Sequence, residues 1–305
     1  MGDTMTRLFL TFMFLALNVS SAAASALGSS QSKTTIILTS FPILQDVVKA
    51  LAPQGAVVEC LVPRDGDIHS YKPTAQDVLR LEKAHLVLLW GLELDENVQR
   101  LTQTKSLQSR THVVTDRISK PSSNPTAPHA DPHLWQSPRK MKEVVLQIER
   151  ILKTSDPSQA AVIEKRSLKF QKNLEKIARH YQKKFSRLKT SQKKLVTPHQ
   201  AFDYLAQEMG LESVALLGAD PDQSPSLKSL QAVIQRLKRE KTPVLFRESS
   251  LESSWLENVA RETGAQIRGP LYADGLTLEP PAHAYPQVLE YNLETIWTAL
   301  QEVPK

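Results

Sequence analysis

The chain has almost no cysteine. Its 305 residues include one, Cys60, so an intrachain disulfide is impossible. Cys60 lies in the apolar run 57–62, where we interpret it as a small core residue. No cysteine follows the apolar segment at the N-terminus, and the lipid-attachment site that tethers many exported bacterial proteins is therefore not expected. Metals that prefer thiolate ligands are disfavoured for the same reason.

The apolar segment at the N-terminus is short. It covers residues 8–17, about half of the roughly 20 residues that a membrane-spanning helix needs. Small residues follow it, and a start at Met5 would leave Arg7 as the basic residue before it. We interpret residues 1–26 as a cleavable signal peptide and expect a periplasmic protein that is not lipid-anchored. A retained membrane anchor is the alternative.

Negative charge is scarce in one part of the chain. Overall, 38 Lys and Arg against 32 Asp and Glu give a net charge of +6, but residues 139–194 hold 17 basic and 5 acidic residues. A basic helical face of this kind could bind nucleic acid or an anionic membrane surface. We interpret it as a solvated outer face and expect no nucleic-acid partner, because a signal peptide directs the protein away from nucleic acid.

Short apolar runs alternate with helical patterns along the whole chain after the signal. Continuous apolar strands that alternate with helices predict parallel sheets with helices on both faces. A hydrophobic fraction of 41% in 305 residues is enough for two packed cores. We predict strands at 34–39, 57–62, 85–90, 111–114, 194–197, 213–217, 243–246 and 266–272. We predict helices at 42–51, 94–101, 138–152, 201–209, 227–238, 255–263 and 285–300, and a further helix that Thr74 caps.

Residues 155–190 show the pattern of one uninterrupted helix. Residues 158–190 contain no Gly or Pro, and apolar side chains recur there at steps of three, four and seven residues. Asp156 is expected to cap the start of the helix. At 1.5 Å per residue the helix would be roughly 50 Å long, so we expect it to brace two lobes. The predicted fold is α/β, with two lobes at 27–154 and 191–305 that each have a central, mainly parallel sheet flanked by helices and are joined by this long rigid helix.

Four candidate metal ligands come from four separate loops. His69 and His199 follow predicted strands, Asp274 follows the last predicted strand, and His133 ends the polar loop 115–132. In an open parallel sheet, ligands gather at the carboxyl ends of the strands. Three imidazoles and one carboxylate suit Zn²⁺ in tetrahedral coordination, whereas Mn²⁺ prefers more oxygen. The spacing alone is a weak signal, because a single histidine in a loop is usually not a ligand.

Six short motifs carry a resemblance to a known family. They are HSYKPT at 69–74, LLWG at the end of 84–91, DPHLWQSP at 131–138, TPHQAFDY at 197–204, LYADGL at 271–276 and EYN at 290–292. With these motifs the chain resembles the metal-binding components of bacterial ABC importers for zinc and manganese, in which a long rigid helix joins two lobes. The resemblance covers essentially the whole mature chain.

The resemblance implies a ligand set, a metal and partners. The metal ligands that it implies, at the cleft between the lobes, are His69, His133, His199 and Asp274. The position of His199 is typically glutamate in manganese members, so its histidine favours Zn²⁺ over Mn²⁺. The implied function is a high-affinity periplasmic zinc receptor, not an enzyme, that works as a monomer with the membrane permease and the ATPase of an ABC importer. A periplasmic metallochaperone is a further candidate partner.

The chain departs from many zinc members of this family in one loop. Many members carry a long His-rich loop, but 115–132 holds only His129, so a loop that scavenges extra metal is not expected. Asp131 and Glu248 are candidates for orienting the ligand imidazoles, because metal-bound histidines commonly donate their other N–H to a carboxylate. The remaining histidines are expected to be structural or exposed: His85, His112, His180 and His283.

Other functions stay open on the same residues. A manganese or iron receptor of the same family is the first alternative. A zinc-dependent hydrolase would need an open coordination position for water, whereas four protein ligands close the shell. A surface adhesin stabilised by a structural metal is the third, and it would be hard to strip of its ion without unfolding.

Overall fold

The computed structural model describes residues 34–64, 66–118, 130–217, 226–249 and 254–303. Residues 35–305 form one compact unit. The predicted signal peptide 1–26 lies outside the described residues, as do His129 and most of the loop 115–132. The division of the chain into domains at residues 26, 154 and 190 stays a prediction.

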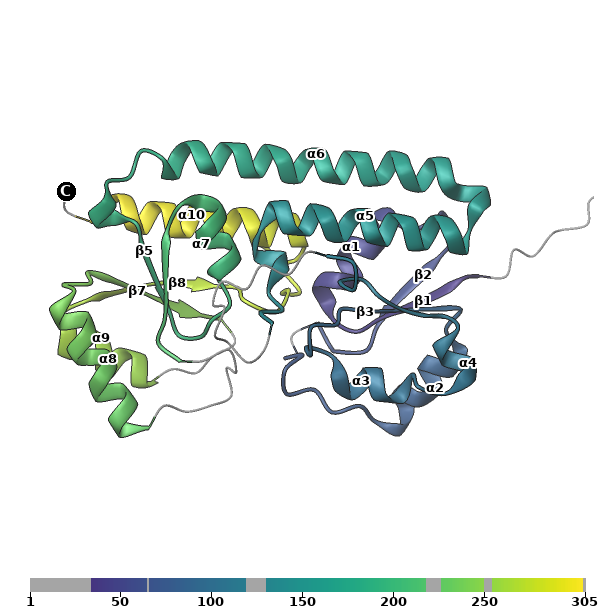
Figure 1. Ribbon diagram of the computed structural model, residues 1–305, viewed down its shortest axis with the longest axis horizontal. Helices are drawn as coiled ribbons and strands as arrows, with labels where there is room; N and C mark the ends of the chain where they lie inside the picture. Colours follow the sequence, from purple (N-terminus) through teal and green to yellow (C-terminus); the bar gives the residue numbers. More distant parts are fainter. Residues whose placement is uncertain (1–33, 65, 119–129, 218–225, 250–253, 304–305) are drawn as a thin grey trace, which may run out of the picture. The chain divides into compact units, whose positions relative to one another are not determined.

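A four-stranded sheet with the strand order β2-β1-β3-β4 organises the first half of the unit (Figure 1). Its strands are β1 (Ile36–Thr39), β2 (Val57–Cys60), β3 (Leu86–Leu89) and β4 (Thr111–Val113). All neighbouring strands are parallel, as the alternation of strands and helices predicted. The order changes direction at β1, and in sheets of this kind ligands bind beyond the carboxyl ends of the strands.

Helices cover both faces of this sheet. The four helices are α1 (Pro42–Leu51), α2 (Ala75–Lys83), α3 (Glu96–Leu101) and α4 (Lys105–Gln108). Alternate residues of β3 belong to different cores: Leu88 packs in the cluster that contains α1, and Val87 packs with side chains of α2, α3 and α4. Thr74 caps α2 through the backbone N–H of Asp77, as predicted. The short helix α4 was not predicted.

The second half repeats this arrangement with two pairs of parallel strands. β5 (Lys194–Thr197) pairs with β6 (Glu212–Ala215), and β7 (Val244–Glu248) pairs with β8 (Gln266–Leu271). β5 also contacts β7, so the pairs lie next to each other (Figure 1). One side packs against α8 (Leu227–Arg239) and α9 (Ser254–Thr263), and the other against α7 (Asp203–Met209) and α10 (Tyr285–Gln301).

The long helix α6 (Ala160–Phe185) runs over both halves (Figure 1). It packs against α1 and α5 (Pro138–Ser155) of the first half and against α7 and α10 of the second. Its predicted apolar seam is the buried face, with the following side chains buried: Ile163, Leu174, Ile177, Tyr181 and Phe185. Contacts of one rigid helix with both halves limit how far the halves can move apart.

The prediction of one helix over 155–190 was wrong at both ends. Asp156 does not cap α6; it lies in a break after α5, where a 3₁₀ turn at Pro157–Gln159 precedes α6. Its carboxylate accepts the Ser158 hydroxyl instead. The helix ends at Phe185, and its 26 residues give a length of about 39 Å.

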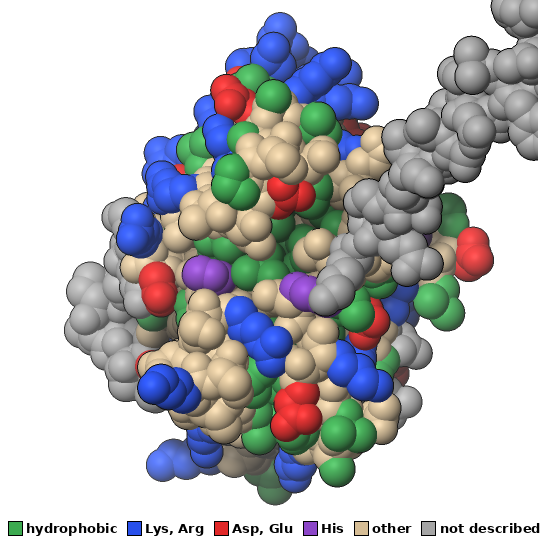
Figure 2. Space-filling view, turned by 90° about the vertical axis from the view of Figure 1, so that its right-hand side faces the viewer, with side chains coloured by type: hydrophobic (Ala, Val, Ile, Leu, Met, Phe, Trp, Pro, Cys, Tyr) green, Lys and Arg blue, Asp and Glu red, His purple; other side chains and the backbone are tan. Residues whose placement is uncertain are grey.

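The basic excess of the sequence lies on the outside of the helical layer. Figure 2 shows Lys and Arg side chains gathered at the top of the face it draws, where α5 and α6 lie. In the part of the chain that the structure describes, none of the helices has the length and apolar character needed to cross a membrane.

Candidate metal centre

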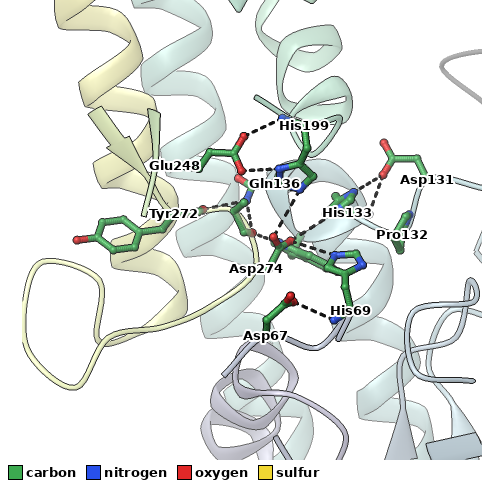
Figure 3. Close-up of polar contacts among 12 residues, drawn as sticks. Asp67, His69, Asp131, Pro132, His133, Gln136, His199, Glu248, Tyr272 and Asp274 are labelled. Carbon is green, nitrogen blue, oxygen red and sulfur yellow. Dashed lines mark hydrogen bonds and ion pairs between the residues drawn. The ribbon is translucent and has the colours of Figure 1, made fainter. Parts of the chain in front are cut away.

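Four loops bring one side chain each to a common point. His69 lies in the loop between β2 and α2, and His133 precedes the 3₁₀ turn η1 (Leu134–Gln136). His199 lies two residues after β5, and Asp274 lies three residues after β8. One ligand atom from each of these side chains lies within 4.8 Å of the others (Figure 3). We call this group the His3Asp cluster; it contains all four residues that the sequence analysis selected.

The carboxylate of Asp274 stands between the three imidazoles. Its Oδ1 lies 3.3 Å from the Nε2 of His133 and 3.7 Å from the Nε2 of His69. Its Oδ2 lies 3.5 Å from the Nε2 of His199. A tetrahedral ion with bonds of about 2.0 to 2.1 Å has ligand atoms about 3.4 Å apart. The separations of Oδ1 from His133 and His69 are therefore close to an edge of a tetrahedral site, while His199 lies nearest the other oxygen, Oδ2.

The atoms that face the centre of the cluster have no hydrogen-bond partner among the described residues. These atoms are the three imidazole Nε2 atoms and Oδ1 of Asp274, and all four are buried. The side chains of His133 and His199 are 0% exposed, and that of Asp274 is 5% exposed. Buried polar atoms are nearly always satisfied, so four unsatisfied atoms around one point fit a cation that all four contact.

Carboxylates fix the orientation of two of the imidazoles. Oδ1 of Asp131 lies 2.7 Å from the Nδ1 of His133 and also accepts the backbone N–H of His133 at 2.9 Å. Glu248 contacts the Nδ1 of His199 and accepts its backbone N–H at 3.2 Å. A carboxylate on Nδ1 leaves Nε2 to point at the metal and makes it a stronger ligand. The structure thus shows both contacts that the sequence analysis suggested for Asp131 and Glu248.

His69 is held differently from the other two histidines. Its backbone N–H donates to Oδ1 of Asp67 at 2.9 Å, and its side chain is 15% exposed. Among the described residues, no carboxylate lies against its Nδ1. Sequence reasoning missed Asp67, although Asp-X-His occurs at both 67–69 and 131–133. An aspartate that accepts the backbone N–H two residues later forms a turn, and this spacing was the available signal.

Two buried amides hold the backbone in front of Asp274. Nε2 of Gln136 donates to the carbonyl of Ala273 at 2.7 Å. The side chain of Asn292 pairs with the backbone of Tyr272, accepting its N–H at 2.9 Å and donating to its carbonyl at 2.8 Å. Sequence reasoning quoted the motifs that contain Gln136 and Asn292 but gave neither residue a role. Each is a buried polar residue in an apolar segment, which was the only signal.

The electrostatics of the cluster favour a charged Asp274 carboxylate and raise the pKa values of His133 and His199 in the metal-free protein. Burial by itself raises the pKa of Asp274, but its contacts with His133 and His69 hold that pKa well below its ordinary value. Burial by itself lowers the pKa of His133, but Asp131 and Asp274 raise it to about 10. The pKa of His199 is also raised, because Glu248 outweighs the effect of burial. A metal ion must therefore displace protons to bind.

The other histidines of the described chain lie outside the cluster, as expected: His85, His112, His180 and His283. The Nδ1 of His85, for example, accepts the backbone N–H of Ile36 at 3.1 Å and so supports the start of β1. The thiol of Cys60 is half-buried, and burial raises its pKa to about 11, which disfavours the thiolate that a metal would need.

Comparisons with known proteins agree with this fold. The family model described as zinc-uptake complex component A, periplasmic (ZnuA), matches residues 37–299. The iron-binding protein YfeA of Yersinia pestis is 29% identical over 293 residues, which cover 95% of this chain and 94% of YfeA. The Mn-bound periplasmic metal binding protein from candidatus Liberibacter asiaticus is 26% identical, with a TM-score of 0.79 and coverage of 88% of this chain and 100% of that protein. The periplasmic zinc binding protein TroA from Treponema pallidum is 25% identical, with a TM-score of 0.80 and coverage of 88% and 99%.

Proposed function

Because the chain belongs to the family of periplasmic component A proteins of zinc-uptake complexes, we propose that it captures Zn²⁺ and delivers it to the permease of an ABC importer. Its general role, as the metal-binding receptor of such an importer with a permease and an ATPase as partners, follows from the family. The choice of Zn²⁺, and the His3Asp cluster as the place where it binds, are the specific parts of the proposal.

The unsatisfied atoms of the cluster carry this proposal. Three buried Nε2 atoms and one carboxylate oxygen lack hydrogen-bond partners among the described residues. The 3.3 and 3.7 Å separations of Oδ1 of Asp274 from the Nε2 atoms of His133 and His69 lie near the edge of a tetrahedron around Zn²⁺, and the Nε2 of His199 lies 3.5 Å from Oδ2. Four protein ligands also close the coordination shell, as a receptor that holds an ion without reacting requires.

The donor set supports Zn²⁺ over Mn²⁺. Three imidazoles with one carboxylate suit zinc, whereas manganese prefers more oxygen ligands. One observation favours a second candidate, a receptor for Mn²⁺ or iron: Oδ1 of Asp274 faces His69 and His133, and Oδ2 faces His199. If both oxygens bind, the ion has five ligands, which suits the larger ions; a relative named for iron is similar in sequence, and a Mn-bound protein has the same fold.

Competition between the two metals tests the proposal. Metal-free protein is loaded with Mn²⁺ and titrated with Zn²⁺ in the presence of a chelator of known affinity. We expect Zn²⁺ to displace Mn²⁺ even when the free concentration of Zn²⁺ is lower than the concentration of the protein. The Asp274→Asn variant should bind both ions at least roughly 100-fold more weakly, because it loses the one anionic ligand. The matched control His180→Ala changes an exposed histidine outside the cluster and should bind as the unchanged protein does.

Two outcomes would contradict the proposal. Retention of a substantial share of Mn²⁺ or Fe²⁺ against an equal concentration of Zn²⁺ would favour the second candidate, because an ordinary site with nitrogen and oxygen ligands prefers Zn²⁺ to both. Binding by Asp274→Asn with unchanged affinity would mean that the ion sits elsewhere in the protein.

A further inference from the structure

Arg64 connects the two loops that carry His69 and Asp274. It lies five residues before His69, in the loop between β2 and α2. Its Nε donates to the carbonyl of Thr277 at 2.9 Å, and its Nη2 donates to the carbonyl of His283. Both carbonyls belong to the segment between β8 and α10, which also holds Asp274. One side chain of the first half thus binds the second half across more than 200 residues of sequence.

The two carbonyls that accept hydrogen bonds from Arg64 lie at the two ends of a short loop, residues 277–283, which we call the closed loop. The backbone N–H of Thr277 donates to the carbonyl of Ala282 at 2.8 Å, which closes the loop between them. The backbone of Arg64 also approaches this segment, because a Cβ added to Gly275 would lie 3.9 Å from the carbonyl oxygen of Arg64. Gly275 directly follows Asp274, so the contact reaches the residue next to the cluster.

Arg64 also lines a cavity that Asp274 of the cluster borders. A cavity of about 520 Å³ is lined by Arg64, Asp67 and Asp274, together with residues of the closed loop. His69 is the most exposed of the three histidines of the cluster, and among the described residues no carboxylate contacts its Nδ1. Its position relative to Asp274 therefore depends on how the two loops are held together.

We propose that Arg64 is a positioning residue that ties the loop of His69 to the loop of Asp274 and so slows the escape of the bound ion. This inference rests on the proposed function, because it takes the His3Asp cluster as the place where the ion is held. A guanidinium can serve two carbonyls at once with its fixed fork of donors, whereas the ammonium of lysine acts as a single point. The tie acts at the cluster and is not needed to keep the halves together, since Asp46 accepts the backbone N–H of Tyr285 and α6 packs on both halves.

The rate of metal release tests the tie. Zinc-loaded protein is mixed rapidly with excess chelator, and release is followed by the fluorescence of Trp135, whose ring lies 5.1 Å from that of His133. Arg64→Ala should release Zn²⁺ roughly tenfold faster, because it loses two hydrogen bonds from a charged donor. Arg64→Lys should fall between Arg64→Ala and the unchanged protein. The matched control Arg187→Ala changes an exposed arginine far from the cluster and should release at the original rate.

A second comparison separates a positioning role from a general loss of stability. The affinity for Zn²⁺ is measured in His69→Ala with Arg64 present and with Arg64→Lys. If Arg64 acts through His69, the second change should weaken binding less than twofold once His69 is absent. Arg64→Lys alone should weaken it several-fold, and its metal-free melting temperature should match that of the unchanged protein.

Each result decides between the alternatives. Release by Arg64→Ala at the original rate, or an equal effect of Arg64→Lys with and without His69, would overturn the inference alone. A protein that binds neither Zn²⁺ nor Mn²⁺ before any change would overturn the proposed function and this inference with it.

Discussion

Metal binding should release protons even at a pH where ordinary histidines are neutral. The pKa of His133 is raised to about 10, although burial opposes it, because Asp131 and Asp274 face the imidazole. At pH 8 a histidine with its usual pKa of about 6.5 is only about 3% protonated, whereas one with a pKa of about 10 is almost fully protonated. Since the metal needs a neutral imidazole, binding of Zn²⁺ at pH 8 should release about one proton from His133.

The sign of the pH effect follows from the raised pKa. The proton that competes with the ion is held until the pH passes about 10, so affinity should rise with pH by roughly tenfold per unit for each such proton. An unperturbed histidine would add less than about a twofold gain above pH 7. Asp274 adds nothing to this slope near neutral pH, because its contacts hold its pKa well below the ordinary value although burial opposes them.

Calorimetry in buffers of different ionisation enthalpy counts these protons. Asp131→Asn removes the carboxylate that contacts the Nδ1 of His133, so its proton release at pH 8 should fall. Asp67→Asn is the matched control, because Asp67 accepts a hydrogen bond from the backbone N–H of His69 and does not contact its imidazole. Release of fewer than about 0.3 protons by the unchanged protein, or equal release by Asp131→Asn, would refute the reasoning.

Three further predictions follow from the surroundings of the cluster. Glu248→Gln should weaken Zn²⁺ binding about 10- to 100-fold in chelator competition, because the amide is a poorer acceptor for the Nδ1 of His199; unchanged affinity would show that Glu248 does not tune the ligand. Asn292→Leu should lower the free energy of unfolding of the metal-free protein by about 2 kcal/mol in urea titrations, because the backbone N–H of Tyr272 loses its acceptor and the carbonyl of Tyr272 keeps only Gln136 as a donor, whereas the exposed Asn173→Leu should change it little. Removal of the ion by a chelator should leave the far-ultraviolet circular dichroism spectrum unchanged; loss of helical signal would instead favour a structural metal, as in an adhesin.

The bounds of helices and strands were predictable from the sequence where a local signal, such as a proline or a short apolar run, marked them. The predicted helix 42–51 and strand 194–197 have the bounds of α1 and β5, because a proline fixes the first and a short apolar run the second. The ends of the long helix were not predictable in this way. Leu188 is buried beyond Phe185 and continues the same apolar steps, so the periodicity does not show that the helix has ended. The break at Asp156 separates two helices with similar patterns and contains no glycine.

Sequence motifs identified the candidate ligands, but they did not identify the residues that hold those ligands in place. His133 and Asp274 stand in recognisable motifs, but their proximity depends on packing between residues more than 100 positions apart. Gln136 and Asn292 carry no metal chemistry of their own, and their importance lies in backbone contacts that only the folded chain creates. Arg64 belongs to the same class, because its acceptors are main-chain carbonyls, which every residue offers.

The charges of the buried cluster explain how one site can be stable both with and without its ion. Asp131, Glu248 and Asp274 place three carboxylates around two buried imidazoles, and uncompensated charges would be costly there. In the metal-free protein, contacts with these carboxylates outweigh burial and raise the pKa values of His133 and His199, so that protonated imidazole partly offsets the carboxylates. Exchange of imidazole protons for a divalent ion therefore limits the change in the net charge of the buried site. The protein can therefore load and release the ion without exposing a bare carboxylate cluster, and a fall in pH shifts the exchange toward release.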